Sequence, residues 1–176
     1  TIRNQIVESR IKADKEKIVY LQSYADPLHW LEENVSEPTV ILSDDEFSAY
    51  IPIRTKHYVL FSPSGVLQMV SDHELETRYL ISRFLGGGPS LEDINNDLKF
   101  YGGAGKALLG SKMQEHFALM YDRYQNEIKP NIKSYLSDFK VGYAVVSISD
   151  STGRQQMEKL GAEEVYKDAS FIIYIL

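Results

Sequence analysis

The sequence predicts an α/β protein in which a mainly parallel sheet of about five strands has helices on both faces. Short apolar, β-branched runs at 39–42, 57–61 and 142–148 have the composition of buried strands. Capped or amphipathic segments separate these runs, which favours crossover connections between parallel strands. Two further strand-like runs, at 164–166 and 171–175, surround a polar turn and predict an antiparallel C-terminal hairpin.

The first two predicted elements are helices. Residues 1–25 are expected to form an N-terminal connector helix, because isoleucines recur among charged residues at helical spacing in a thin apolar stripe. A second helix is predicted at 27–34, with Asp26 as its N-cap and Pro27 in its first turn. Trp30 lies on the apolar face of that helix and is expected to pack in the core.

The first two strands enclose an acidic segment. After the strand at 39–42, the sequence SDDEFSAY predicts a short helix capped by Ser43 or Asp44. Residues 51–53 are expected to be extended, because a proline disfavours the helical conformation of the residue before it. The second strand follows at 57–61.

Helices dominate the middle of the chain. Ser71 and Glu74 have the spacing of a capping box and start a helix that is expected to end before the Gly-Gly-Gly-Pro sequence at 86–89. Ser90 can cap another short helix. Because no strand-like run occurs between about 88 and 138, this segment is predicted to be a helical insertion.

The strand at 142–148 is the strongest in the chain and is expected to be central. The next helix begins near Ser149 and Asp150 and ends before Gly161, which suits a left-handed position after a helix. Together with the hairpin, these elements describe a Rossmann-like three-layer arrangement, a single domain over 26–176 with the helical insertion within it.

Composition excludes several classes of function. The 176 residues carry a formal net charge of −6, which argues against binding to nucleic acid or anionic lipid. The absence of cysteine excludes disulfides and thiolate metal sites, and the four histidines lack metal-ligand spacing, so no zinc site is expected. No other metal and no cofactor are expected either. No stretch is long and apolar enough to span a bilayer, so the chain itself is expected to be soluble.

Four residues near the first two strands are candidate contacts for a ligand or an acceptor substrate. Asp44 and Asp45 follow the first strand, and ligands of open α/β sheets bind at the C-terminal edge. Thr55 lies just before the second strand and His57 at its start, where a phosphate or a sugar could bind. For each pair a structural role, in helix capping or in a polar loop, is the more frequent one. No catalytic set of residues can be assembled from the known motifs.

A glycine-rich segment at 102–106 supports a different hypothesis. Gly102, Gly103, Gly105 and Lys106 resemble part of a phosphate-binding loop, but Ala107 stands where the Walker pattern needs Ser or Thr. The sequence GGAGKALL is also similar to the pyrophosphate loop of GCN5-related acyltransferases, and MEKLGAEEVYKDASFIIYI is similar to their closing segment. That family would use backbone amides of this loop to hold coenzyme A. The strand that should precede the loop is not predicted here.

A second resemblance covers about 26–85 and 140–176. The segments DPLHWLEENV, TVILSDDEFSAYIPIRTKHYVLFS, SDHELETRYLISRFL and VGYAVVSISD occur in a fixed order before the closing LGAEEVYKDASFIIYIL. This order resembles the C-terminal extracytoplasmic soluble domain of polytopic GT-C-type membrane proteins, the group of the protein mannosyltransferases and oligosaccharyltransferases. The segment 86–139 has no counterpart in that pattern.

The GT-C resemblance implies that the chain is a soluble, non-catalytic accessory domain of a membrane-tethered protein and faces the extracytoplasmic side. Its partner would be the membrane-spanning part of the same polypeptide, which would carry the catalytic carboxylates. The domain would cover the membrane site or help to bind an acceptor, a glycan or a lipid-linked sugar. Two alternatives stay open from sequence, a soluble GCN5-like acyltransferase and an interaction module without a ligand.

Overall fold

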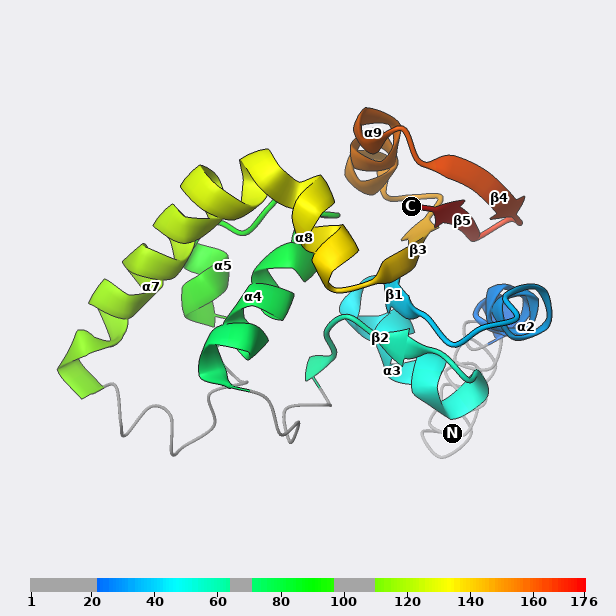
Figure 1. The fold of residues 1–176 in the computed structure, drawn as a ribbon, viewed down its shortest axis with the longest axis horizontal. Coiled ribbons are helices and arrows are strands. Elements are labelled where there is room, and N and C mark those ends of the chain that lie inside the picture. The colour runs from blue at the N-terminus through cyan, green and yellow to red at the C-terminus, as the bar shows by residue number, and fades with distance from the viewer. Residues whose placement is uncertain (1–21, 64–70, 97–109) are drawn as a thin grey trace, which may run out of the picture.

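A computed structural model describes residues 22–63, 71–96 and 110–176 and confirms the α/β class (Figure 1). Five strands form one open mixed sheet in the order β2-β1-β3-β5-β4. The strands β1, β2 and β3 are mutually parallel, whereas β5 is antiparallel to both β3 and β4. The predicted central strand and C-terminal hairpin are therefore present. The strand bounds are β1 Val40–Leu42, β2 Tyr58–Val59, β3 Val141–Ser147, β4 Glu163–Lys167 and β5 Phe171–Ile175.

The helices divide into two groups. Helices α2 (Ala25–Asn34), α3 (Asp45–Arg54) and α9 (Ser151–Leu160) lie around the sheet. A second group extends to one side in Figure 1 and contributes every described element from 72 to 138. Its members are α4 Asp72–Ser82, α5 Leu91–Asn96, η3 Gly110–Lys112, α7 Met113–Arg123, η4 Tyr124–Ile128, η5 Lys129–Asn131 and α8 Ile132–Asp138.

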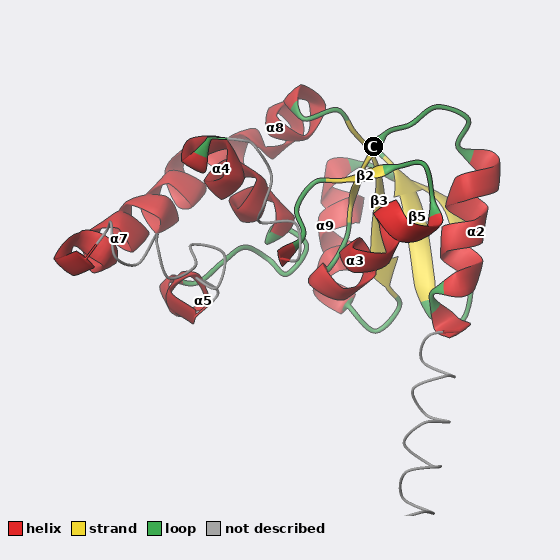
Figure 2. Ribbon diagram, turned by 90° about the horizontal axis from the view of Figure 1, so that it is seen from below, coloured by secondary structure: helices red, strands yellow, loops and turns green. Residues whose placement is uncertain are grey.

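Each face of the sheet has its own hydrophobic cluster. Alternate residues of β3 point to opposite faces, so Val145 joins one cluster and Ala144 and Val146 join the other. The first cluster is completed by α2 and α3, and the second by α4, α7, α8 and α9. Figure 2 shows α2 and α9 on opposite sides of the strands.

Trp30 occupies an intermediate position between core and surface. This α2 residue is only partly buried, and its ring contacts Tyr143 of β3 and Tyr166 of β4, at centroid distances of 6.5 Å and 5.6 Å. The predicted core packing is therefore present at the margin of the first cluster.

Two local predictions are wrong. Residues 51–53 are helical, because α3 continues through Pro52 to Arg54. Burial of Phe47 and Ile51, both fully inaccessible, outweighs the amide hydrogen bond that proline cannot make. Asp26 is not the N-cap of α2 but lies in its first turn, where a carboxylate favours the positive end of the helix dipole.

The domain boundaries predicted at 26 and at 88–138 stay predictions. The proposed connector helix at 1–25 lies almost wholly outside the described residues. In the part of the chain that the structure describes, no helix is long and apolar enough to cross a membrane.

Candidate functional site

The strands β1 and β3 create a crevice at the C-terminal edge of the sheet. They are parallel neighbours, yet the chain leaves them toward opposite faces, through α3 after β1 and through α9 after β3. Such a switch point leaves a gap between the two connections, and ligands of open α/β sheets bind there. We therefore take this crevice as the candidate site.

The crevice has a volume of about 290 Å³ and is bordered by both strand ends and by the segment after α4. Its walls combine carboxylates, one guanidinium, hydroxyls and a glycine loop. The lining residues with polar side chains are Asp44, Ser82, Arg83, Asp93, Ser147 and Asp150. Sequence reasoning had selected only Asp44 among them as a contact.

Two of the carboxylates cap the helices that begin at the crevice. Asp44 Oδ1 accepts hydrogen bonds from the amides of Glu46 and Phe47, at 2.9 and 2.7 Å. Asp150 Oδ1 accepts one from the amide of Gly153 at 2.9 Å. Asp44, rather than Ser43, is thus the cap of α3. Both caps satisfy amides that the first helical turn leaves without intrahelical partners.

The third carboxylate, Asp93, lies in the first turn of α5. Asp93 Oδ2 accepts hydrogen bonds from the amide and the hydroxyl of Ser90, at 2.8 and 2.6 Å. These bonds lower the pKa of Asp93 below its ordinary value. The pKa of Asp44 is raised instead, because loss of surrounding water outweighs its two amide bonds, although Asp44 still reaches solvent.

Each of these three carboxylates has one oxygen that accepts no hydrogen bond from the described part of the chain. The bonds of Asp44 and Asp150 use Oδ1, and those of Asp93 use Oδ2. An ionised carboxylate offers acceptors only, so a matching ligand must bring hydroxyl or N–H donors. The crevice therefore favours a neutral, hydroxyl-rich ligand over an anion.

Asp45 acts next to the crevice rather than in its wall. Its Oδ2 accepts a 2.8 Å bond from Arg83 Nη2, which joins the first turn of α3 to the residue after α4. The Arg83 guanidinium also lies 4.9 Å above the ring of Tyr79. Asp45 thus positions a cation that lines the crevice.

The glycine loop of the crevice is shaped by a buried tyrosine. Gly88 has φ +105°, and a Cβ there would lie 2.4 Å from Tyr124 Cε1. Only glycine permits both the conformation and the contact. Tyr124 is fully buried and its hydroxyl has no hydrogen-bond partner among the described residues. Burial away from water raises the pKa of Tyr124 to about 12.

Thr55 and His57 lie elsewhere and have structural contacts. His57 is 2% exposed; its Nδ1 accepts a bond from the Thr39 amide at 3.3 Å, and its Nε2 lies 3.0 Å from the Leu31 carbonyl oxygen. Since Nδ1 accepts, Nε2 carries the proton and donates to Leu31. The Thr55 hydroxyl donates to the Ile51 carbonyl at 2.8 Å and accepts from the His57 amide at 3.2 Å.

The glycine-loop residues Gly102, Gly103, Gly105 and Lys106 lie outside the described residues. The described positions just before them form helix α5 rather than a strand. Within the described ranges, no group of three or more acidic, histidine or cysteine side chains could hold a metal ion.

No protein-family model, no curated protein and no solved structure matches this chain. The assignment of the crevice as a candidate site therefore depends on its geometry alone. The residues that sequence reasoning missed, Arg83, Asp93 and Asp150, come from three separate segments. One signal was available, because the strands at 40–42 and 141–147 are each followed within two or three residues by a Ser-Asp pair, Ser43-Asp44 and Ser149-Asp150.

Proposed function

We propose that this chain is a non-catalytic, extracytoplasmic accessory domain of a membrane-embedded glycosyltransferase and that it holds a sugar in the β1–β3 crevice. The single observation that supports ligand binding is that three carboxylates line the crevice and each has one oxygen without a hydrogen bond from the described residues. Sugar hydroxyls are donors of the required kind. The membrane context rests on the GT-C resemblance of 26–85 and 140–176.

The proposed fold is the Rossmann-like three-layer arrangement. Three observations support it. The strands β1, β2 and β3 are parallel, helices cover both faces of the sheet, and the crevice lies at the switch point between β1 and β3. In this reading Asp44 contacts the sugar, Asp45 positions Arg83, and Thr55 and His57 maintain the second strand. The membrane-spanning partner is the rest of the same polypeptide.

A soluble GCN5-like acyltransferase is the second candidate. The observation that favours it is the closing order of strand, helix and antiparallel strand pair, β3-α9-β4-β5. That reading needs a strand before the glycine loop, whereas the described residues that precede the loop, 91–96, form helix α5. Acetyl-coenzyme A binding measured by calorimetry separates it from the leading proposal, which expects none. A ligand-free interaction module would bind neither coenzyme A nor a sugar.

The sugar site is tested by titrating the chain with neutral mono- and disaccharides and recording amide chemical shifts by NMR. We expect the shifts to gather around residues 43–46, 86–90 and 147–153. Asn can also cap a helix, so Asp44→Asn and Asp150→Asn keep the fold while changing an acceptor. Both variants should weaken binding, whereas Asp138→Asn, at the end of α8, should not.

Shifts scattered over the surface, or equal effects of all three variants, would contradict the sugar site. The membrane context has its own test, which is the coding sequence upstream of the Thr1 codon. Several encoded apolar stretches of about 20 residues would support it. A start codon directly before Thr1 would contradict the membrane context. The sugar site would then depend on the binding measurements alone.

A further inference from the structure

A second cavity lies at the opposite end of β3. Its volume is about 550 Å³, within the range of about 300–1,000 Å³ that small-molecule sites occupy. It is bordered by α8, by the first residues of β3, by the end of α9 and by the residue after β5. The crevice described above shares no lining residue with it.

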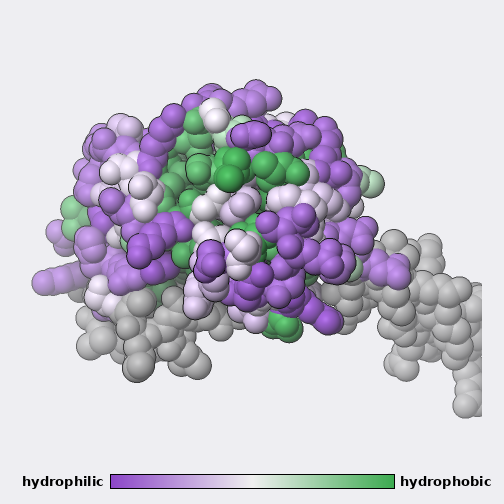
Figure 3. Space-filling view, turned by 45° about the vertical axis from the view of Figure 1, so that its right-hand side comes forward, coloured by the Kyte–Doolittle hydropathy of each residue, from purple (hydrophilic) through white to green (hydrophobic). Residues whose placement is uncertain are grey.

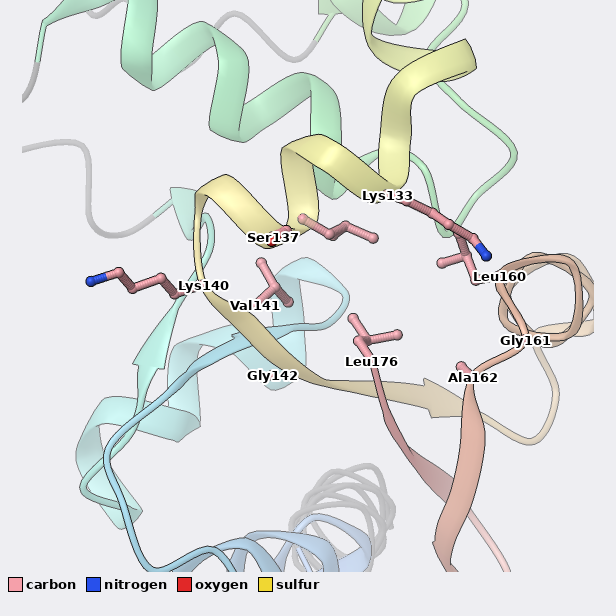
Figure 4. A pocket seen from close by; sticks show the side chains of 10 residues that line it. Lys133, Ser137, Lys140, Val141, Gly142, Leu160, Gly161, Ala162 and Leu176 are labelled. Carbon is pink, nitrogen blue, oxygen red and sulfur yellow. The ribbon is translucent and has the colours of Figure 1, made fainter.

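The walls of this cavity are mainly aliphatic. Leu136 and Val141 are buried, Leu160 and Ala162 are half-buried, and Leu176 is 38% exposed. Figure 4 shows the labelled aliphatic side chains gathered around one space from three directions. Figure 3 shows apolar residues gathered on one face of the molecule with hydrophilic residues around them. Covering an apolar wall that is open to water with a nonpolar group is favourable, because it removes apolar surface from water.

The only charged side chains among the described lining residues are lysines. Lys133 and Lys140 border the cavity, and no Asp or Glu does, although the chain has a net charge of −6. Figure 4 separates their roles, since Lys133 extends across the mouth toward Leu160 whereas Lys140 points away. The described lining side chains thus form an apolar interior with one lysine at the entrance.

Some of the backbone carbonyls at the helix ends near the cavity accept hydrogen bonds within the chain. Two helices end there, and their carbonyls carry partial negative charge. At the end of α9 the amides of Gly161 and Ala162 donate to the carbonyls of Glu158 and Met157, at 2.9 and 3.1 Å. Backbone donors therefore already occupy these carbonyls, in a Schellman arrangement.

We propose that this cavity binds a single-chain anionic amphiphile, with its alkyl chain against the leucines and its phosphate or carboxylate head at Lys133. The site differs from the sugar crevice in place and in ligand class. A monomeric amphiphile in water, rather than a bilayer surface, is the intended occupant.

The probe is decyl phosphate below its micellar concentration, titrated into the chain by calorimetry in about 0.15 M salt, where distant charges are screened beyond about 8 Å. Decanol is the uncharged comparison. We expect Lys133→Glu to weaken decyl phosphate binding about tenfold and to leave decanol binding within twofold. Lys140→Glu makes the same change in net charge beside the same cavity and should change either affinity less than twofold. Leu160→Asn should weaken both ligands.

Three results would overturn the proposal: no saturable binding to the unchanged protein, equal losses from the two lysine variants, or binding only to vesicles that contain decyl phosphate. Circular dichroism confirms that each variant is folded. Should Lys133→Glu not fold, Lys133→Gln is used, with the same order of effects expected.

Discussion

The two ends of β3 border sites of opposite character. At the C-terminal end lies a crevice of about 290 Å³ with three carboxylates, and at the N-terminal end a cavity of about 550 Å³ with aliphatic walls and a lysine. The difference follows from chain direction. Helices α3 and α9 begin at the first end, where aspartates cap their amides, whereas α8 and α9 end at the second. Helix polarity thus accounts for the capping aspartates at the first end, whereas Lys133 at the second end lies in the first turn of α8.

The largest expected effect is at the crevice end. Gly88→Ala should lower the free energy of unfolding by about 2–4 kcal/mol, because it combines a positive φ with overlap against Tyr124. Urea denaturation measures the loss. Gly110→Ala is the control, since Gly110 also has a positive φ, +48°, but an added Cβ there would meet no atom of the described residues beyond its chain neighbours within 4 Å. Equal losses at both positions would mean that the tyrosine does not shape the crevice loop.

The next effect tests whether the N-terminal ends of β1 and β2 are held by structural hydrogen bonds. His57→Phe should cost about 2–3 kcal/mol, because the Thr39 amide and the Leu31 carbonyl would lose a buried partner. Thermal unfolding followed by circular dichroism measures it. A fully stable variant with reduced sugar binding would instead return His57 to the list of ligand contacts.

Capping at the crevice end has a smaller expected effect. Asp44→Ala should cost about 0.5–2 kcal/mol through loss of the cap of α3. Asp44→Asn should cost less, because Asn caps nearly as well. Chemical denaturation of both variants distinguishes capping from charge: if Asn destabilises as much as Ala, the carboxylate charge rather than the cap is responsible.

At the cavity end, one substitution should raise the free energy of unfolding. Lys140 has φ +54°, a left-handed conformation that costs a non-glycine residue about 1–2 kcal/mol. Lys140→Gly should therefore raise the free energy of unfolding by about 0.5–1 kcal/mol, allowing for the greater freedom of glycine in the unfolded chain. A loss of stability in denaturant titration would show that the lysine side chain contributes more than its backbone costs.

The smallest expected effect is the pH dependence of stability that two crevice carboxylates, Asp93 and Asp44, contribute. The pKa of Asp93 is lowered, so the stability it contributes is present above the unfolded value and is lost as pH falls through its folded pKa. The pKa of Asp44 is raised, so its contribution has the opposite sign and is lost as pH rises through its folded pKa. Carboxyl carbon NMR should find Asp93 titrating below 3.8 and Asp44 above it. The reverse order would contradict the difference in their surroundings.

Local signals predicted much of the fold. The central strand, the capping by Ser71, the left-handed Gly161 and the terminal hairpin each depend on a few adjacent residues, and all are present. Pro52 was misjudged because a local preference for extended structure yields to burial of its helix on the sheet. Packing of that kind depends on residues distant in sequence.

The site was harder to predict because its members meet only through topology. Asp44 follows β1, Asp150 follows β3, and Arg83 and Asp93 flank the glycine loop. Strand order decides that these segments converge, and no local pattern encodes that β1 lies beside β3. His57 precedes β2 whereas Asp44 and Asp45 follow β1, so the parallel strands place them at opposite edges of the sheet.

The position of β5 between β3 and β4 has a consequence for synthesis. While the ribosome is still making residues 171–175, β3 has an unpaired edge and β4 has no neighbour in the sheet. The pairing of β1 with β3 also waits, because the hydrogen bond at their start joins residues 101 positions apart. Exposed strand edges invite association with other chains. We therefore expect nascent chains that stop short of β5 to depend on chaperones more than the completed chain does.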